Sequence, residues 1–173
     1  MLNHIGDAYA ALGDRVNAVA SYKDALERMK GNTIGEAILL GNRGLFYMRA
    51  GDGENARKDL DEALAKSREA KNDVLTAVTL NNLGLLESAL GEYTAAAREF
   101  AAALELPDKT GDTQQWAVTM INSGFLNNSL GENDKALESY RKALAEMERL
   151  NNERGQAFVL NNIGLSEALK GDK

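Results

Sequence analysis

Apolar and polar positions recur along this chain at a nearly constant interval. One phrase, a large apolar residue followed two places later by Asn or His and four places later by Gly, occurs five times. Its copies are Leu2-Asn3-His4-Ile5-Gly6, Leu40-Gly41-Asn42-Arg43-Gly44, Leu80-Asn81-Asn82-Leu83-Gly84, Met120-Ile121-Asn122-Ser123-Gly124 and Leu160-Asn161-Asn162-Ile163-Gly164. The final glycines are 38, 40, 40 and 40 residues apart. Self-similarity of this kind is the sequence signature of a repeat architecture.

Two further patterns follow each phrase. Five glycines are each followed by Asp or Glu, and they are Gly13, Gly51, Gly91, Gly131 and Gly171. After the first four comes an alanine, a large residue four places on, and an Ala-Leu pair three places beyond it. The copies are Ala18/Tyr22/Ala25/Leu26, Ala56/Leu60/Ala63/Leu64, Ala96/Phe100/Ala103/Leu104 and Ala136/Tyr140/Ala143/Leu144. Steps of four and three place these residues on one stripe of a helix.

Each unit is therefore predicted to be a helix A, a tight turn at Gly-Asp/Glu, and a helix B. The turn glycine tolerates a positive φ at the end of helix A, and the acid after it suits the N-terminus of helix B. A glycine inside helix A, as at Gly44, Gly84 and Gly124, is unfavourable by roughly 1 kcal/mol relative to alanine. We expect it to be there because it lets a partner helix approach closely.

Such units bury their apolar stripes only by stacking, so the chain is predicted to be a single all-α array, a solenoid of about nine helices. Its approximate units are residues 1–36, 37–76, 77–116, 117–156 and a partial unit at 157–173. The chain begins inside a helix A and stops just after one, which favours a piece of a longer array.

The order Gly-x2-Tyr, Ala-x3-Phe, Ala resembles the signature of the tetratricopeptide repeat. Gly6-Asp7-Ala8-Tyr9 and Gly44-Leu45-Phe46-Tyr47 match its first part. The interval is 40 residues instead of about 34, and the usual terminal proline is replaced by Lys30, Arg68, Asp108 and Glu148. This longer form is similar to repeats of kinesin light chains, Pins-type polarity adaptors and many bacterial regulators. HEAT and armadillo repeats share the interval but lack the glycine phrase.

The resemblance implies a right-handed α-solenoid in which the A helices line a concave groove that binds a partner protein. The position two before the helix A glycine faces such a groove and here forms the series His4, Asn42, Asn82, Asn122 and Asn162. An amide both donates and accepts, so an asparagine ladder can pair with the backbone of an extended peptide. The alternative is that these asparagines join one helix to another.

Apolar residues are expected to share the groove with the asparagines. After the helix A glycine come Asp7, Leu45, Leu85, Phe125 and Leu165, and one turn before the asparagine come Ile38, Val78, Val118 and Phe158. Some of them, and the neighbouring series Phe46, Leu86, Leu126 and Ser166, can instead belong to the core between units. Arg43 and Arg49 are the candidate cations, too few for a site that clamps an acidic C-terminal tail. Asp59, Asp61 and Glu62 are interpreted as solvated charge on an exposed helix face.

Composition narrows the classes of function. Of the 173 residues 44% are hydrophobic, and the net charge of −6 belongs entirely to residues 72–173, because residues 1–71 are neutral. The acidic part indicates a solvated surface or a bias toward basic partners, and clustered Lys/Arg for nucleic acid is lacking. The chain has no cysteine and a single histidine, His4. It therefore lacks the residues for thiolate metal sites and nucleophilic triads.

These observations predict a protein–protein interaction scaffold or adaptor that binds a peptide or helix of a partner, with no catalytic residues, metal or cofactor. The predicted groove residues are Asn42, Asn82, Asn122, Asn162, Leu45, Leu85, Phe125, Leu165 and Arg49. Alternatives are a self-association module, or the sensory part of a larger regulator or enzyme. We expect no membrane partner, because no apolar run approaches the roughly 18 residues of a spanning helix. The lack of cysteine and of a signal sequence favours a cytoplasmic protein.

Overall fold

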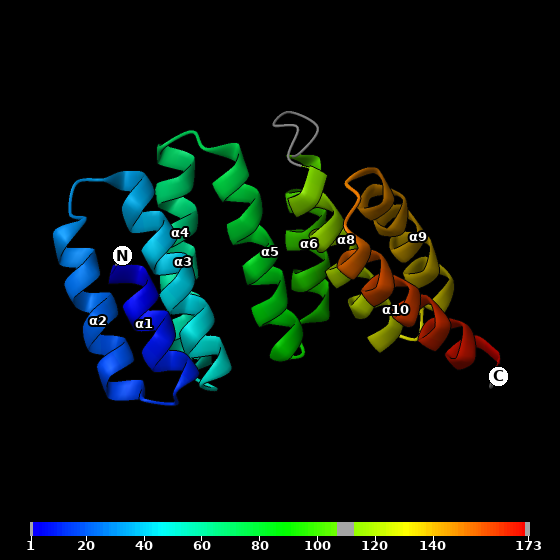
Figure 1. Cartoon of the computed structure of the whole chain (residues 1–173), viewed down its shortest axis with the longest axis horizontal. Coiled ribbons are helices and arrows are strands. Elements are labelled where there is room, and N and C mark those ends of the chain that lie inside the picture. The colour runs from blue at the N-terminus through cyan, green and yellow to red at the C-terminus, as the bar shows by residue number, and fades with distance from the viewer. Residues whose placement is uncertain (1, 107–112, 172–173) are drawn as a thin grey trace.

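The computed structural model describes residues 2–106 and 113–171, and in the first helix it describes the side chains of Gly6 and of residues 8–11. Nine α-helices and no strand occur within these ranges. They are α1 (Leu2–Ala11), α2 (Arg15–Arg28), α3 (Thr33–Arg49), α4 (Gly53–Glu69), α5 (Asp73–Ala89), α6 (Tyr93–Glu105), α8 (Thr113–Ser129), α9 (Asn133–Arg149) and α10 (Glu153–Gly171). The prediction of an all-α solenoid is confirmed (Figure 1).

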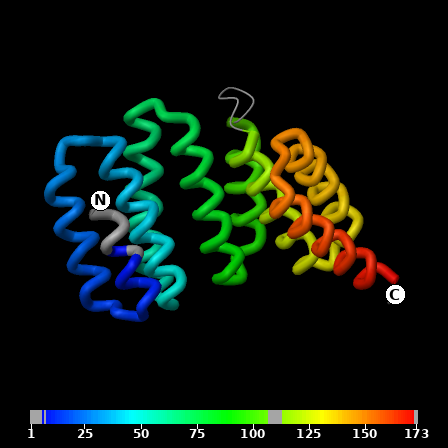
Figure 2. Tube along the Cα trace, viewed as in Figure 1, coloured from blue at the N-terminus to red at the C-terminus, as the bar shows by residue number. Residues whose placement is uncertain are grey.

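The helices pair in chain order, as the glycine phrases predict. Unit 1 is α1 with α2, unit 2 is α3 with α4, unit 3 is α5 with α6, unit 4 is α8 with α9, and α10 is the helix A of unit 5. Figure 2 shows the units side by side along one axis, from the N-terminus to the C-terminus. Successive A helices contact one another from α1 to α8, whereas each B helix contacts its own A helix and the next one. The A helices therefore form the closely spaced side of the stack.

Turn chemistry fixes where the helices end. Gly51 and Gly91 have φ of 74° and 79°, as predicted for the turn from helix A to helix B. Asp52 caps α4 and accepts a hydrogen bond from the backbone N of Asn55 at 3.2 Å, whereas Glu92 reaches the same place without a capping bond. Glutamate is a poorer N-cap than aspartate. The turn expected at Gly171 is not formed, because α10 continues through that residue.

The turns from helix B to the next helix A use a device that the glycine pattern does not reveal. Asn32, Asn72 and Asn152 each accept a hydrogen bond, 2.9 Å long, from the backbone N of the residue three places on. Short polar side chains satisfy the orphan amide groups of a helix N-terminus in this way. The residue before each cap has a positive φ, which is 88° at Gly31, 51° at Lys71 and 52° at Asn151.

The glycine inside helix A makes room for the bulky side chain of helix B in the same unit. An added Cβ would lie 2.7 Å from Cγ of Leu60 at Gly44, 2.6 Å from Cε1 of Phe100 at Gly84, and 2.5 Å from Cε1 of Tyr140 at Gly124. These separations are far below van der Waals contact. The expectation that the helical glycine permits close packing is therefore confirmed in units 2, 3 and 4.

The same bulky side chains also hold one unit to the next. Tyr22 of α2 contacts Phe46 of α3, with ring centroids 5.9 Å apart. Leu60 packs with Leu86 of the next unit, and Phe100 packs with Leu126. Phe46, Leu86 and Leu126 are buried, so this series belongs to the core between units and not to the groove.

Replacement of Gly84 by alanine should destabilise the array. The new Cβ would press on the buried Phe100 ring, and overpacking of this kind costs about 1–3 kcal/mol. The higher helix propensity of alanine offsets up to about 1 kcal/mol of this loss. We expect a net loss of unfolding free energy, measured by urea denaturation followed by circular dichroism.

Gly164→Ala is the matched control for this substitution. Gly164 occupies the same place in the repeat, but a Cβ there meets no atom within 4 Å. The substitution should therefore stabilise the protein by up to about 1 kcal/mol through helix propensity alone. Equal effects of the two substitutions would contradict the packing role of Gly84.

Candidate functional site

The A helices carry a repeated stripe of apolar and amide side chains, in the order that the sequence predicts. On α3 it consists of Ile38, Asn42, Leu45 and Arg49, spaced by four, three and four residues, so the four share one helix face. Several large apolar side chains of this repeated stripe are exposed. Ile38 is 42% exposed, Val118 36%, Phe125 41%, Phe158 51% and Leu165 55%.

Exposed apolar side chains of neighbouring A helices contact each other at the C-terminal end of the stack. The rings of Phe125 on α8 and Phe158 on α10 are 6.1 Å apart, and Phe125 also meets Tyr140 of α9 edge-on at 5.8 Å. Leu85 differs, because it is half-buried and packs on the cluster that contains Phe100 and Leu126. The predicted apolar series therefore divides into exposed residues and half-buried ones, which are Leu45, Val78 and Leu85.

A cleft of about 700 Å³ lies between units 1 and 2. It brings together three of the predicted groove residues, Asn42, Leu45 and Arg49, all from α3. The lining also includes Ala10 and Ala11 of α1, Arg15 and Tyr22 of α2, and Phe46 of α3. The cleft is therefore the place where the predicted site is both hollow and lined by several polar and apolar groups. The side chain of His4, the unit 1 member of the asparagine series, lies outside the described residues.

The four predicted ladder asparagines are not equivalent. Asn122 donates from Nδ2 to Oδ1 of Asn81 at 2.8 Å, and Asn81 in turn approaches Oδ1 of Asn82 at 3.4 Å. Asn162 donates to the backbone O of Phe158 at 2.8 Å. Asn122 thus joins α8 to α5, which is the bridging role that we kept as the alternative.

Asn42 is the exception within the part of the chain that the structure describes. Its side chain is half-buried on the cleft wall, and none of the hydrogen bonds among those residues involves its amide. An amide with donors and an acceptor unused is ready to bind an incoming polar group. The groove role of all four asparagines stays a prediction, and Asn42 is the member best placed for it.

The two candidate arginines have different surroundings. Arg43 forms a bidentate ion pair with Asp59 of α4, with distances of 2.6 and 2.8 Å, and it is unavailable to a ligand. Our interpretation of Asp59 as solvated charge was wrong, because that residue is 3% exposed. The hydrogen bonds to Asp59 hold the pKa of the Arg43 guanidinium above its ordinary value. Arg49 is exposed and makes no ion pair with any described residue.

Two family models, both described as tetratricopeptide repeat, match residues 35–109 and residues 1–28, together more than half of the chain. The chain is a tetratricopeptide repeat protein. No match was found among curated proteins.

Solved structures that resemble this tetratricopeptide array show the same fold. The crystal structure of BtubC (BKLC) from P. vanneervenii has a TM-score of 0.87 at 22% identity, over 99% of this chain and 72% of that one. A crystal structure of the MamA protein has a TM-score of 0.65 at 25% identity, over 98% of this chain and 81% of that one. A second MamA structure has a TM-score of 0.59 at 22% identity, with 98% of both chains covered.

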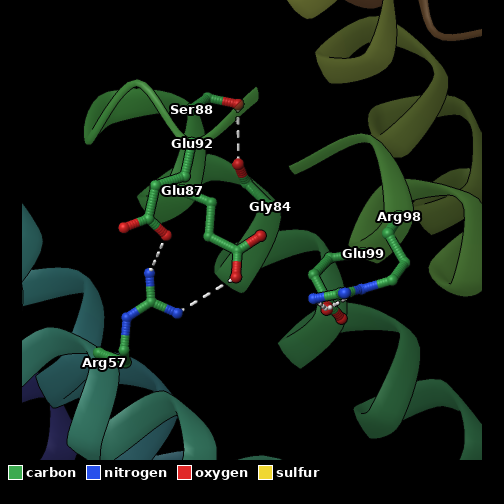
Figure 3. Close-up of polar contacts among 7 residues, drawn as sticks. All are labelled: Arg57, Gly84, Glu87, Ser88, Glu92, Arg98 and Glu99. Atoms are coloured by element: carbon green, nitrogen blue, oxygen red, sulfur yellow. Dashed lines mark hydrogen bonds and ion pairs between the residues drawn. The ribbon is translucent and has the colours of Figure 1, made fainter. Parts of the chain in front are cut away.

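Unit 3 departs from the tetratricopeptide signature at its tyrosine position. Tyr9 and Tyr47 stand three residues after the helix A glycine in units 1 and 2, but unit 3 has Glu87 there. Glu87 is 4% exposed and accepts a hydrogen bond of 3.2 Å from Arg57 of α4, which also pairs with Glu92 at 2.7 Å (Figure 3). This ion pair joins unit 2 to unit 3.

The second carboxylate oxygen of Glu87, Oε2, is buried without a hydrogen-bond partner. Burial is the main cause that raises the pKa of Glu87 above its ordinary value, and the nearby Glu99 carboxylate adds to it. Arg57 and Arg98 act in the opposite direction. The missing tyrosine is visible in the sequence, but units 4 and 5 lack it as well, with Asn127 and Glu167 in its place. The sequence therefore does not single out Glu87, and its partners lie on other helices.

The described ranges contain no group of three or more His, Cys, Asp or Glu side chains that could hold a metal ion. Nor does any helix within them have both the length and the apolar character required to cross a membrane.

The raised pKa of Glu87 predicts a pH-dependent stability. The folded protein binds this proton more tightly than the unfolded chain, so the stabilisation is complete below the ordinary glutamate pKa and is lost as the pH rises through the raised value. Glu87→Gln removes the titration while keeping the shape. The unfolding free energy of the wild type, relative to Glu87→Gln, should fall as the pH rises across a range that begins below the ordinary glutamate pKa of about 4.

Glu92→Gln is the control, since Glu92 contacts the same arginine from an exposed position. Urea denaturation of the three proteins across that pH range provides the measurement. A constant difference between the wild type and Glu87→Gln would show that Glu87 does not titrate as an unusual group.

Proposed function

We propose that this protein is an interaction scaffold that holds a peptide or helix of a partner protein along the face formed by its A helices. A protein-interaction repeat scaffold is the role that the tetratricopeptide family and fold support. Tetratricopeptide repeat proteins are generally scaffolds and not enzymes, and function is carried by sites on the fold and not by the fold itself.

The observation that carries the proposal is the cleft between units 1 and 2. Asn42, Leu45 and Arg49 line it together, and two of them have unused polar groups. A few placed polar groups among apolar walls are what a binding site offers to orient its ligand. Exposed apolar residues continue the face along the stack to Phe158 and Leu165, which gives a bound segment further places to pack.

An amphipathic segment fits this face better than a fully polar one. Exposed large apolar residues on one side of a monomer mark interaction surfaces when they are contiguous and edged by polar groups. Phe125 and Phe158 supply aromatic contact area, and aromatic residues dominate the energetics of many interfaces. Asn42 and Arg49 supply the polar edge at the other end.

Two substitutions within the face test this proposal. Ile38→Lys combined with Leu165→Lys places charge in both halves of the face at exposed positions, so the fold should be retained while an apolar ligand is repelled. Proteins captured by the wild-type chain from a lysate of the source cells should be lost from the double variant, as measured by mass spectrometry.

The matched control changes two exposed apolar residues of B helices. Val16 is 79% exposed and Tyr93 is 39% exposed, so Val16→Lys with Tyr93→Lys adds the same charge on two B helices. This variant should capture the same proteins as the wild type. Loss of the captured proteins in the control, or their retention in the Ile38/Leu165 variant, would count against the A-helix face.

A further inference from the structure

Two unused polar groups on α3 face one cleft. Asn42 and Arg49 are seven residues apart, which is two turns of the helix, and Leu45 lies between them on the same wall. The other ladder asparagines, Asn82, Asn122 and Asn162, are engaged by groups of the protein itself. The coincidence of a free amide and a free guanidinium on one wall distinguishes this cleft from the rest of the A-helix face.

The described lining of the cleft carries no acid. The net charge of the protein is −6, yet none of the described residues that line the cleft is acidic; the side chain of Asp7 lies outside the described residues. Arg15, also on the lining, is already paired with Asp52 at 2.9 Å. Arg49 is therefore the available cation, and the corresponding positions in the other units are Ala11, Ala89, Ser129 and Leu169.

We propose that the cleft between units 1 and 2 binds an acidic side chain, Asp or Glu, within a continuous segment of the partner protein. This rests on the proposed function and names the chemistry that anchors the segment. The carboxylate pairs with Arg49, the amide of Asn42 binds the segment's backbone beside it, and a neighbouring apolar side chain packs on Leu45. Arginine suits this role because its planar fork matches a carboxylate.

A single free cation limits which anion the cleft can bind. One unpaired guanidinium balances one carboxylate, whereas a phosphate group carries nearly two charges and recruits clusters of arginines. The stripe continues past the cleft to Ile38 on α3. An internal segment of the partner can therefore contact the stripe on both sides of its acidic residue. Arg43 is paired with Asp59, which leaves Arg49 as the free one of the two candidate cations named for a C-terminal clamp.

The probe is a phage-displayed library of random 16-residue peptides, held as an internal insert and selected on the purified chain. Selected peptides should share an Asp or Glu at a fixed spacing from an apolar residue. A synthetic peptide, acetylated and amidated at its ends, should bind at least about tenfold more tightly than its Glu→Gln or Asp→Asn version. Fluorescence anisotropy measures both affinities.

Variants of the protein make the assignment specific to Arg49. Arg49→Gln should weaken binding of the acidic peptide by a similar factor. It should also remove the difference in affinity between the acidic peptide and its amide version. Arg49→Glu should select peptides with Lys or Arg at the same position. Arg68→Gln is the matched control, because Arg68 lies in the last turn of α4 as Arg49 lies in the last turn of α3, and it should leave binding unchanged.

Several results would overturn the proposal. Equal binding of the acidic and amide peptides, an unaffected Arg49→Gln, or a requirement for a phosphorylated residue or a free C-terminus would each reject the acidic side chain as the anchor. If peptides are still selected and Ile38→Lys with Leu165→Lys abolishes their binding, the A-helix face stands without this anchor. Failure of the folded wild type to select any peptide would reject the face itself.

Discussion

The contact between the helix A glycine and the bulky helix B side chain sets how closely the two helices of each unit approach. Phe100 fills the space that Gly84 leaves open, and the same ring then packs against Leu126 of the following unit. One side chain thus fixes both the geometry within a unit and the join to its neighbour. Close-packed interiors accommodate little change in volume, so the stacking of the A helices, and with it the candidate site, depends on these few side chains.

Local periodicity made the fold predictable. The glycine intervals and the Ala-x3-aromatic stripe contain the information on helix pairing, because each unit repeats the same short-range rules. The turns at Gly51 and Gly91 and the buried role of Phe100 followed from them. Helix caps such as Asn72 were overlooked, although a short polar residue before an apolar run is a recognised start signal.

The candidate site could be predicted only in part, since its character depends on contacts between residues far apart in sequence. The sequence pattern placed Asn42, Asn82 and Asn122 in one class, yet the bond from Asn122 to Asn81 spans 41 residues. Asp59 was misjudged for the same reason, as its partner Arg43 lies on the other helix of the unit. Periodicity identifies the face on which a residue lies, but it does not indicate which polar groups satisfy one another.

Every helix in the described residues contacts only helices that are near it in the chain. The array therefore has a low contact order, a property that favours rapid folding, and the stability of such an array is approximately a sum of unit and nearest-neighbour contributions. A ligand lying across several A helices would supply the long-range connections that the polypeptide lacks. It would act as a splint along the stack, so that loss of an end unit would first require release of the ligand.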